Sequence, residues 1–186
     1  MRPESEHRRG AGVDVTGRAS VRPFLAVEWE TYRDLRLRSL EDSPDAFGVT
    51  LADAQARPQS FWSERLQSGI DSGLDQPLCA FFDGEPIGLA WGLIEPTDLE
   101  QAHLFQMWVA PQHRARGIGR MLLDEIVAWA RKKGARLLTL SVTVGSSVAE
   151  RMYRDAGFEA FGEPEPLRLR SPLLVQPMRL RLAKQP

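Results

Sequence analysis

Apolar and polar residues alternate along this chain with two different periods, and each period predicts a different kind of element. Apolar residues at helical spacing predict helices over residues 28–40, 58–67, 118–133 and 147–156. Short apolar or strictly alternating runs predict strands over residues 21–24, 78–82, 86–93, 101–110, 138–144, 158–161 and 175–182. The pattern therefore indicates a chain of mixed helices and strands, with no internal repeat.

Short motifs predict where several of these elements begin and end. Asp83-Gly84 lies between two apolar runs and predicts a hairpin. Ser147 and Glu150 have the spacing of a capping box, which predicts a helix start, and Gly157 predicts the end of that helix. Pro177 lies in the last expected strand and favours an edge or a bulge over a central position.

Composition and charge restrict the class of protein. We expect a disordered lead-in over residues 1–18 and a single domain over residues 19–186. The net charge of −1 argues against a nucleic-acid or anionic-membrane partner, and no apolar run approaches the roughly 18 residues that span a bilayer. One cysteine and three separated histidines predict neither a disulfide framework nor a metal site. We therefore expect a cytoplasmic protein.

The most distinctive stretch is residues 113–123, His-Arg-Ala-Arg-Gly-Ile-Gly-Arg-Met-Leu-Leu, where an expected strand gives way to an expected helix. Unpaired backbone N–H groups and the positive end of a helix dipole make such a turn suitable for an anion. The glycine spacing fits neither a dinucleotide fingerprint nor a P-loop. Two interpretations of this stretch are left equally open: a compact site for a pyrophosphate, or a solvated basic helix start with glycines for a tight turn.

Taken singly, the other reactive side chains have ordinary structural explanations. Tyr153 on an amphipathic helix suits a core residue. Cys79 in an apolar strand suits a small buried hydrophobe rather than a nucleophile. His103 in a strand suits a structural role, and His113 suits a loop.

Three motifs in order resemble the GNAT superfamily of N-acetyltransferases, as in a bacterial single-domain member. They are Met107-Trp-Val-Ala-Pro111, Arg114-Ala-Arg-Gly-Ile-Gly119 and the stretch from Ser146 to Tyr153 that precedes Gly157-Phe158. Residues 21–23 and 43–48 resemble the acceptor-side half of many bacterial members. The resemblance extends from about residue 20 to residue 182.

This resemblance implies acetyl-CoA as the co-substrate. In the family, backbone groups at the positions of Met107 and Val109 bond the pantetheine arm where two strands separate, which is a form of strand addition. The turn over residues 114–120 takes the pyrophosphate, and Ser146, where many members have Asn, is a candidate polar contact. The cofactor-binding residues so implied are Met107, Trp108, Val109, Arg114, Ala115, Arg116, Gly117, Ile118, Gly119, Arg120 and Ser146.

The resemblance also implies a catalytic acid and indicates a base. Tyr153 matches the family's general acid; a tyrosine near pKa 10 stays protonated beside a leaving thiol near pKa 8.5. His103 occupies the strand position where some members have a glutamate base, with Glu100 or water as the alternatives. Strand alternation predicts that His103 faces the same side as Met107 and Val109 unless a bulge intervenes.

We therefore expect an α/β (α+β) fold with a mixed, mostly antiparallel sheet of about six or seven strands flanked by helices. The expected activity is direct acetyl transfer to a primary amine of a small molecule or peptide, with residues 41–60 and 162–175 as the acceptor walls. The alternative is a non-catalytic acyl-CoA-binding sensor on the same fold. Nucleic-acid binding is disfavoured because no recognition motif is present, and a homodimer is allowed for.

Overall fold

The computed structural model describes residues 18–183. The expected lead-in therefore lies outside the described residues except for Arg18, as do the last residues of the expected domain. Arg18 is held in place, because its N–H donates to the Asp83 carboxylate at 2.9 Å and its carbonyl accepts from the Asp83 N–H at 3.1 Å.

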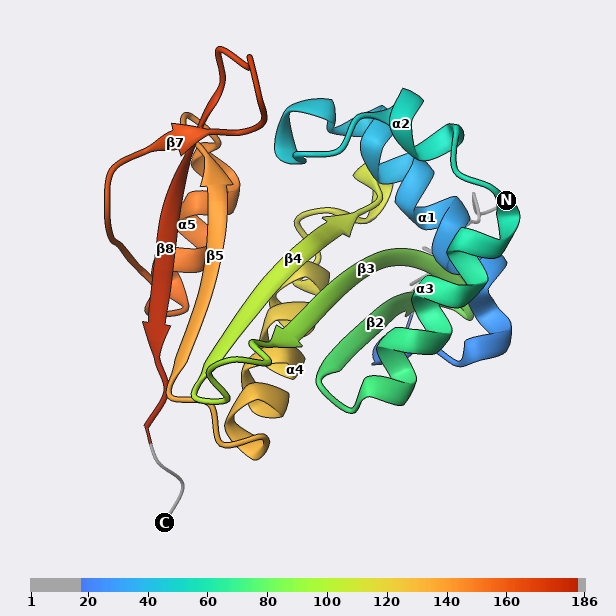
Figure 1. Ribbon diagram of the computed structural model, residues 1–186, viewed down its shortest axis with the longest axis horizontal. Coiled ribbons are helices and arrows are strands. Elements are labelled where there is room, and N and C mark those ends of the chain that lie inside the picture. The colour runs from blue at the N-terminus through green and yellow to red at the C-terminus, as the bar shows by residue number, and fades with distance from the viewer. Residues whose placement is uncertain (1–17, 184–186) are drawn as a thin grey trace, which may run out of the picture.

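The described residues form one mixed sheet of eight strands, in the order β1-β2-β3-β4-β5-β8-β6 with β7 also paired to β8 (Figure 1). The strands are β1 (Ala19–Pro23), β2 (Asp75–Phe82), β3 (Glu85–Ile94), β4 (Gln101–Val109), β5 (Leu137–Thr143), β6 (Glu159–Ala160), β7 (Glu165–Pro166) and β8 (Leu174–Arg181). Only β4 and β5 pair in parallel. The expected mixed, mostly antiparallel sheet is confirmed, but the expected strand count is too low because two-residue β7 has no apolar periodicity to predict it.

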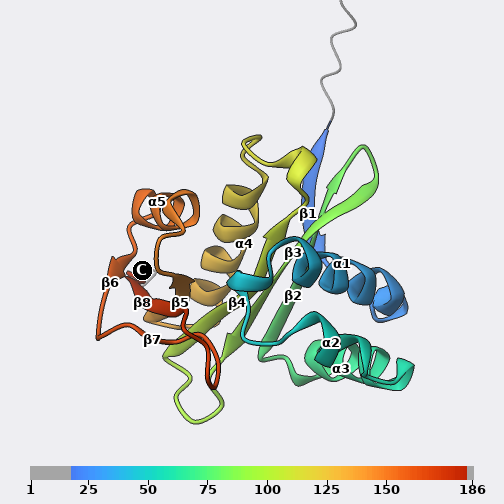
Figure 2. The ribbon, with the colours of Figure 1, turned by 90° about the horizontal axis from the view of Figure 1, so that it is seen from above.

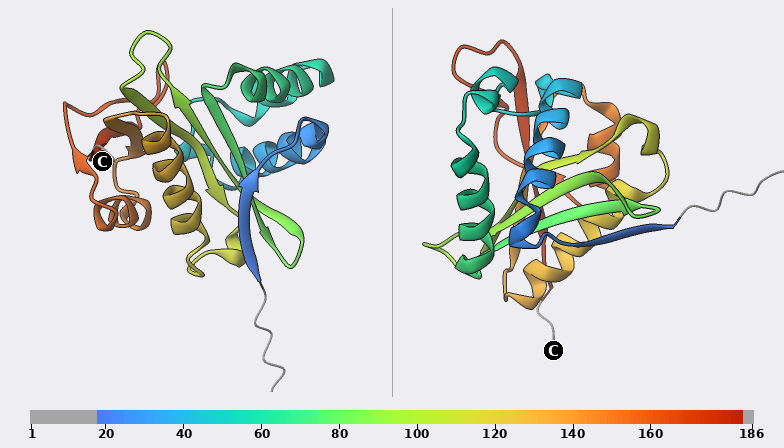
Figure 3. Two further views of the ribbon diagram at one scale, coloured as in Figure 1. Left: turned by 90° about the horizontal axis from the view of Figure 1, so that it is seen from below. Right: turned by 90° about the vertical axis from the view of Figure 1, so that its right-hand side faces the viewer.

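Helices cover both faces of this sheet. They are α1 (Trp29–Asp42), α2 (Leu51–Gln55), α3 (Gln59–Ser72), α4 (Ile118–Lys132) and α5 (Ser147–Asp155). Figure 2 shows α4 and α5 on one face and α1, α2 and α3 on the other, and Figure 3 shows α1 and α3 side by side. Among residues 18–183, no helix is long and apolar enough to span a membrane.

Helix α4 packs closely on the sheet because a strand residue there has no side chain. Its buried face carries Ile118, Leu122 and Ile126. A Cβ atom at Gly92 of β3 would lie 2.6 Å from the ring of Trp129 and 3.1 Å from Ile126. Glycine at this position therefore allows the helix to approach the strand.

The turn motifs behave largely as their chemistry predicts. Asp83 and Gly84 have φ angles of 51° and 84°, the left-handed pair that a tight hairpin needs, so the predicted β2–β3 hairpin is confirmed. Gly157, with φ 93°, ends α5 as predicted.

The N-cap of α5 that the capping box predicted is wrong by one residue. Ser146, not Ser147, is the N-cap of α5, and its carbonyl accepts from the Glu150 N–H at 3.0 Å. The Glu150 carboxylate turns to Arg154 instead, one helical turn later. Two adjacent serines offer alternative caps, and spacing alone does not decide between them.

Pro177 lies in β8, which has neighbours on both sides, so the edge placement expected from the proline is wrong for the strand as a whole. The Pro177 carbonyl accepts from the Phe161 N–H at 3.0 Å and therefore points away from β5. Since N–H and C=O of one strand residue point to the same side, the proline nitrogen faces the gap between β6 and β7. The absence of an N–H on Pro177 therefore removes no backbone hydrogen bond between β8 and β5.

Strands β4 and β5 separate soon after they meet (Figure 1). They pair from Gln101 to His103 of β4, the last pair being His103 with Thr139, whereas β5 stays paired with β8 up to Thr143. Farther along β4, the register with β3 shifts and Gln106 has φ 55°. Gln106 is thus the extra residue of a β-bulge, and the separated strands leave a V-shaped opening.

Candidate active site

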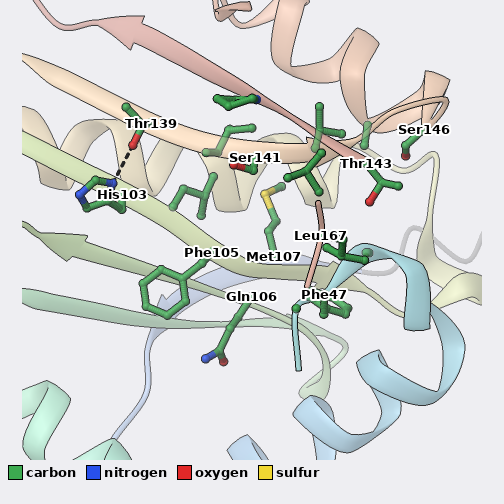
Figure 4. Close-up of a pocket in the computed structure, with 18 of the residues that line it drawn as sticks. Phe47, His103, Phe105, Gln106, Met107, Thr139, Ser141, Thr143, Ser146 and Leu167 are labelled. Atoms are coloured by element: carbon green, nitrogen blue, oxygen red, sulfur yellow. Dashed lines mark hydrogen bonds between the residues drawn. The ribbon is translucent and has the colours of Figure 1, made fainter. Parts of the chain in front are cut away.

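The opening between β4 and β5 is a cleft of about 780 Å³. Its walls come from both strands, from α5, from residues 46–49 after α1, and from residues 165–167 before β8. Figure 4 shows His103 and Thr139 at one end, Ser146 at the other and Met107 between them. Parts of both predicted acceptor walls therefore lie on the cleft.

The backbone along this cleft is open to a ligand. Past the pair His103–Thr139, the edge of β4 that faces β5 has no strand partner among residues 18–183. Unpaired N–H and C=O groups on a strand edge bind an extended amide chain by strand addition. The β4 edge around Met107 can do so without disturbing β3, which holds the other edge of the strand.

Tyr153 reaches the cleft from α5 and is buried, with 8% of its surface exposed. Its hydroxyl donates only to the sulfur of Met107, a weak acceptor, at 3.6 Å. Burial raises the pKa of Tyr153 to about 12. The group is therefore protonated at neutral pH, and no strong acceptor among the described residues holds its proton.

His103 lies where the strands part. Its Nδ1 is 2.7 Å from the Thr139 hydroxyl and its Nε2 is 3.6 Å from the Glu95 carboxylate. Glu100, the alternative base, does not line the cleft; its carboxylate pairs with Arg136 at 3.0 Å. Of the two side chains considered as bases, only His103 reaches the cleft.

His103 and Met107 face opposite sides of the sheet, because the bulge that the prediction allowed for is present at Gln106 and reverses the alternation between them. Phe105, two residues after His103, stacks on Trp91 on the α1 side of the sheet, with ring centres 6.1 Å apart. Met107 lies toward α5 instead, where Tyr153 contacts it. Both His103 and Met107 line the cleft because the cleft passes between the separated strands.

The turn before α4 presents its backbone as predicted for an anion site. Among residues 18–183, no acceptor bonds the N–H groups from Ala115 to Arg120. Ala115 and Gly117 have φ angles of 58° and 78°, and both positions are exposed. A Cβ at Gly119 would lie 3.6 Å from the Met107 side chain, so this turn adjoins the cleft without lining it. Consecutive unpaired N–H groups at the start of α4 are able to donate hydrogen bonds to an anion such as phosphate.

The three arginines of this turn contact the protein itself. Arg114 pairs with Asp42 and donates to the Val109 carbonyl at 2.9 Å. Arg116 lies over the Phe82 ring, 5.2 Å from its centre, and Arg120 pairs with Asp124 at 2.8 Å. These partners position the turn, so the anion-binding capacity that the structure presents is mainly that of the backbone.

Asp42 links this turn to α1. Its carboxylate accepts from Trp108 Nε1 at 2.8 Å as well as from Arg114. Burial alone would raise the pKa of Asp42, but the hydrogen bonds from Ser43, Trp108 and Arg114 outweigh it and lower the pKa. The Trp108 side chain is therefore buried against α1 and does not line the cleft.

Four of the site residues predicted from the sequence line the cleft, and the others lie outside it. His103, Met107, Ser146 and Tyr153 line the cleft, whereas Trp108, Val109 and residues 114–120 do not. Sequence reasoning missed Gln106, because a left-handed glutamine carries no turn signature. It also missed Arg36 as a cleft residue, although Arg36 lies four residues after buried Tyr32, on the inward face of α1.

Comparisons with known proteins identify the family of this chain. Residues 29–158 match the model of the acetyltransferase (GNAT) family. A [ribosomal protein bS18]-alanine N-acetyltransferase of Salmonella typhimurium is 35% identical over 67% of this chain and 79% of its own. An aminoglycoside N(6')-acetyltransferase of Stenotrophomonas maltophilia is 32% identical over 64% of this chain and 89% of its own.

A solved spermidine N-acetyltransferase of Vibrio cholerae, in complex with CoA and spermine, has a TM-score of 0.74 at 16% identity and covers 89% of this chain and 96% of its own. This chain spans only 36–44% of three longer curated relatives, two of them mycothiol acetyltransferases.

Proposed function

Because the chain belongs to the acetyltransferase (GNAT) family, we propose that it transfers an acetyl group from acetyl-CoA directly to a primary amine. The observation that supports this most is the run of unpaired N–H groups from Ala115 to Arg120 beside a cleft between two separated strands. A phosphate cradle next to an open strand edge suits a ligand that joins a pyrophosphate to an extended amide arm.

Each part of the donor has matching groups in this chain. Residues 115–120 would hold the pyrophosphate through their backbone, and the β4 edge at Met107 and Val109 would hold the pantetheine amides. Ser146, at the far end of the cleft, offers a hydroxyl to the donor or the acceptor. When bound, acetyl-CoA supplies the activated acetyl thioester.

Tyr153 would hold a proton for the departing sulfur. Its hydroxyl is protonated at neutral pH and, among residues 18–183, has only the Met107 sulfur as acceptor, so it can turn to a developing thiolate. Complete transfer from a group of pKa about 12 to a thiolate of pKa about 8.5 is uphill by roughly 5 kcal/mol. Tyr153 would therefore act first as a hydrogen-bond donor, with complete transfer aided by burial of the sulfur.

The attacking amine must lose a proton first. A lysine-type amine with a pKa near 10.4 is about 0.1% neutral at pH 7.4, which costs roughly 4 kcal/mol. His103 would accept this proton directly or through water, since its ring lines the cleft where β4 and β5 part and a Thr139 contact orients it. Cys79 is buried and burial raises its pKa to about 12, which favours direct transfer over an acetyl-cysteine intermediate.

The acceptor would be an amine of a small molecule or a peptide, the classes named for the ribosomal-protein and aminoglycoside relatives. We propose a cytoplasmic enzyme without a nucleic-acid partner. Assembly as a homodimer stays a prediction that light scattering at micromolar concentration can check.

The proposal is tested by thiol release from acetyl-CoA with polyamines, aminoglycosides, amino acids and peptides as acceptors. For the best acceptor, Tyr153→Phe should lower kcat by well over tenfold and leave acetyl-CoA affinity within twofold. Thermal unfolding of both proteins controls for folding. Equal turnover by the variant would contradict the role of Tyr153, and tight acetyl-CoA binding without turnover of any amine would favour the non-catalytic sensor.

A further inference from the structure

Arg36 is a buried cation on the wall of the cleft. It lies on α1 with 6% of its surface exposed, one of the two polar or charged residues buried in the described chain. Its neighbours along the buried face of α1 are Tyr32, Leu35, Ser39 and Leu40. A charge at this depth normally has a carboxylate partner, because removing it from water costs several kcal/mol.

No carboxylate among residues 18–183 pairs with Arg36. Its only hydrogen bond there runs from Nη1 to the Ser39 hydroxyl at 3.2 Å, and its guanidinium lies 4.3 Å from the centre of the Phe47 ring. Burial lowers the pKa of Arg36 to about 10, so it is still charged at neutral pH. The remaining N–H donors of its planar fork have the geometry to bind an oxyacid.

The other residues that line the cleft add little negative charge to balance Arg36. Glu165 is the one carboxylate among its lining residues, and it lies exposed on β7. A polycationic acceptor would therefore meet a buried arginine and little negative charge. Arg168 holds Phe47 against Arg36 from outside, donating to the carbonyls of Phe47 at 3.0 Å and Pro44 at 3.3 Å.

We propose that Arg36 binds an anionic oxyacid group, a carboxylate or a phosphate, on the acceptor while the acceptor's amine lies between β4 and β5. The inference rests on the proposed function, because it needs an acceptor in this cleft. It names the substrate class as amines that carry an acid, and it makes Arg36 a specificity-determining residue.

Matched acceptor pairs test this proposal in the full-length protein. L-Amino acids are compared with their amides, and phosphoethanolamine with ethanolamine, at saturating acetyl-CoA. The wild type should prefer the acidic member of at least one pair by tenfold or more in kcat/KM, and the pair that shows it identifies carboxylate or phosphate. Arg36→Met should reduce that preference to less than threefold, through loss of the acidic substrate only.

Two further variants keep the result interpretable. Arg33→Met removes a charge from the same helix, where Arg33 pairs with Asp34, and should keep the wild-type preference. Arg36→Lys keeps the charge but loses the planar fork, and should retain an intermediate preference if Arg36→Met unfolds. Acetyl-CoA KM should be unchanged throughout.

Equal use of acids and amides by the wild type, the same preference after Arg36→Met, or best turnover of polyamines would overturn the proposal. A parallel rise in acetyl-CoA KM would overturn it too, by assigning Arg36 to the donor. In all of these cases acetylation itself would still be observed, so the proposed function would stand; absence of acetyl-CoA binding would instead remove both.

Discussion

At the residue scale, burial shifts two cleft groups in opposite directions. The pKa of Tyr153 is raised to about 12 and the pKa of Arg36 is lowered to about 10, because burial disfavours the charged form of each. At neutral pH Tyr153 is a neutral donor and Arg36 a cation. The cleft thus holds one neutral hydroxyl donor and one positive charge without a carboxylate partner among the described residues.

The tyrosines provide a direct test of this burial. The chain has two, Tyr32 and Tyr153, and burial raises the pKa of both. Native protein should therefore show less tyrosinate absorbance near pH 10 than the urea-unfolded chain, which titrates there. A folded pKa above the unfolded one stabilises the protein below pH 10, and for Tyr153 this stabilisation is lost as pH rises toward 12.

Tyr153→Phe should remove part of that alkaline loss of stability, as measured by urea unfolding at pH 8 and pH 11. Titration of both native tyrosines near pH 10 would show that the two hydroxyls are hydrated and would contradict the packing around α1 and α5.

At the element scale, the start of α4 and the bulge of β4 together shape the proposed donor site. The N–H groups before α4 are predictable from glycines and a helix start, and the strands from their apolar periods. The bulge is not predictable from the sequence, because Gln106 resembles any other strand residue. Only the register of β4 with β3 shows that the side chains on either side of Gln106 change faces. Arg36 was missed for a related reason: a cation between apolar positions of a helix suggests exposure, and only the packing of α1 shows otherwise.

The backbone character of the phosphate cradle can be tested at Arg120, an exposed residue in the first turn of α4. Arg120→Ala removes the side chain and its pair with Asp124 but keeps the N–H, so acetyl-CoA affinity should change less than threefold. Arg120→Pro also removes the N–H, which the first helical turn tolerates, and should weaken affinity by tenfold or more.

S-acetyl-pantetheine lacks the pyrophosphate and should bind both variants alike. A loss of acetyl-CoA affinity as large for Arg120→Ala as for Arg120→Pro would assign the binding to the guanidinium instead of the backbone.

At the scale of the whole molecule, segments far apart in the sequence close the cleft. Arg168, from the loop before β8, bonds two carbonyls after α1, and the Thr143 hydroxyl of β5 donates to the Asp45 carbonyl at 2.6 Å. The sequence predicted residues 41–60 and 162–175 as acceptor walls, since neither segment has a regular pattern of apolar residues. It could not show that they contact each other, because the Arg168 side chain bonds carbonyls that lie 121 and 124 residues earlier in the chain.

Arg168→Ala removes these bonds and should raise the acceptor KM about three- to tenfold while acetyl-CoA KM stays constant, since the phosphate cradle lies elsewhere. Steady-state kinetics with each substrate varied in turn measures both values. Arg170→Ala, an exposed change in the same loop, is the matched control and should leave both constants unchanged. A larger effect on acetyl-CoA than on the acceptor would contradict this division of the cleft.

The central claim is that this chain binds acetyl-CoA in the cleft between β4 and β5. Isothermal titration of the folded protein with acetyl-CoA tests it most directly. We predict one site per chain, with an affinity that Arg120→Pro weakens by tenfold or more. No measurable binding of acetyl-CoA by protein that unfolds cooperatively would contradict the account.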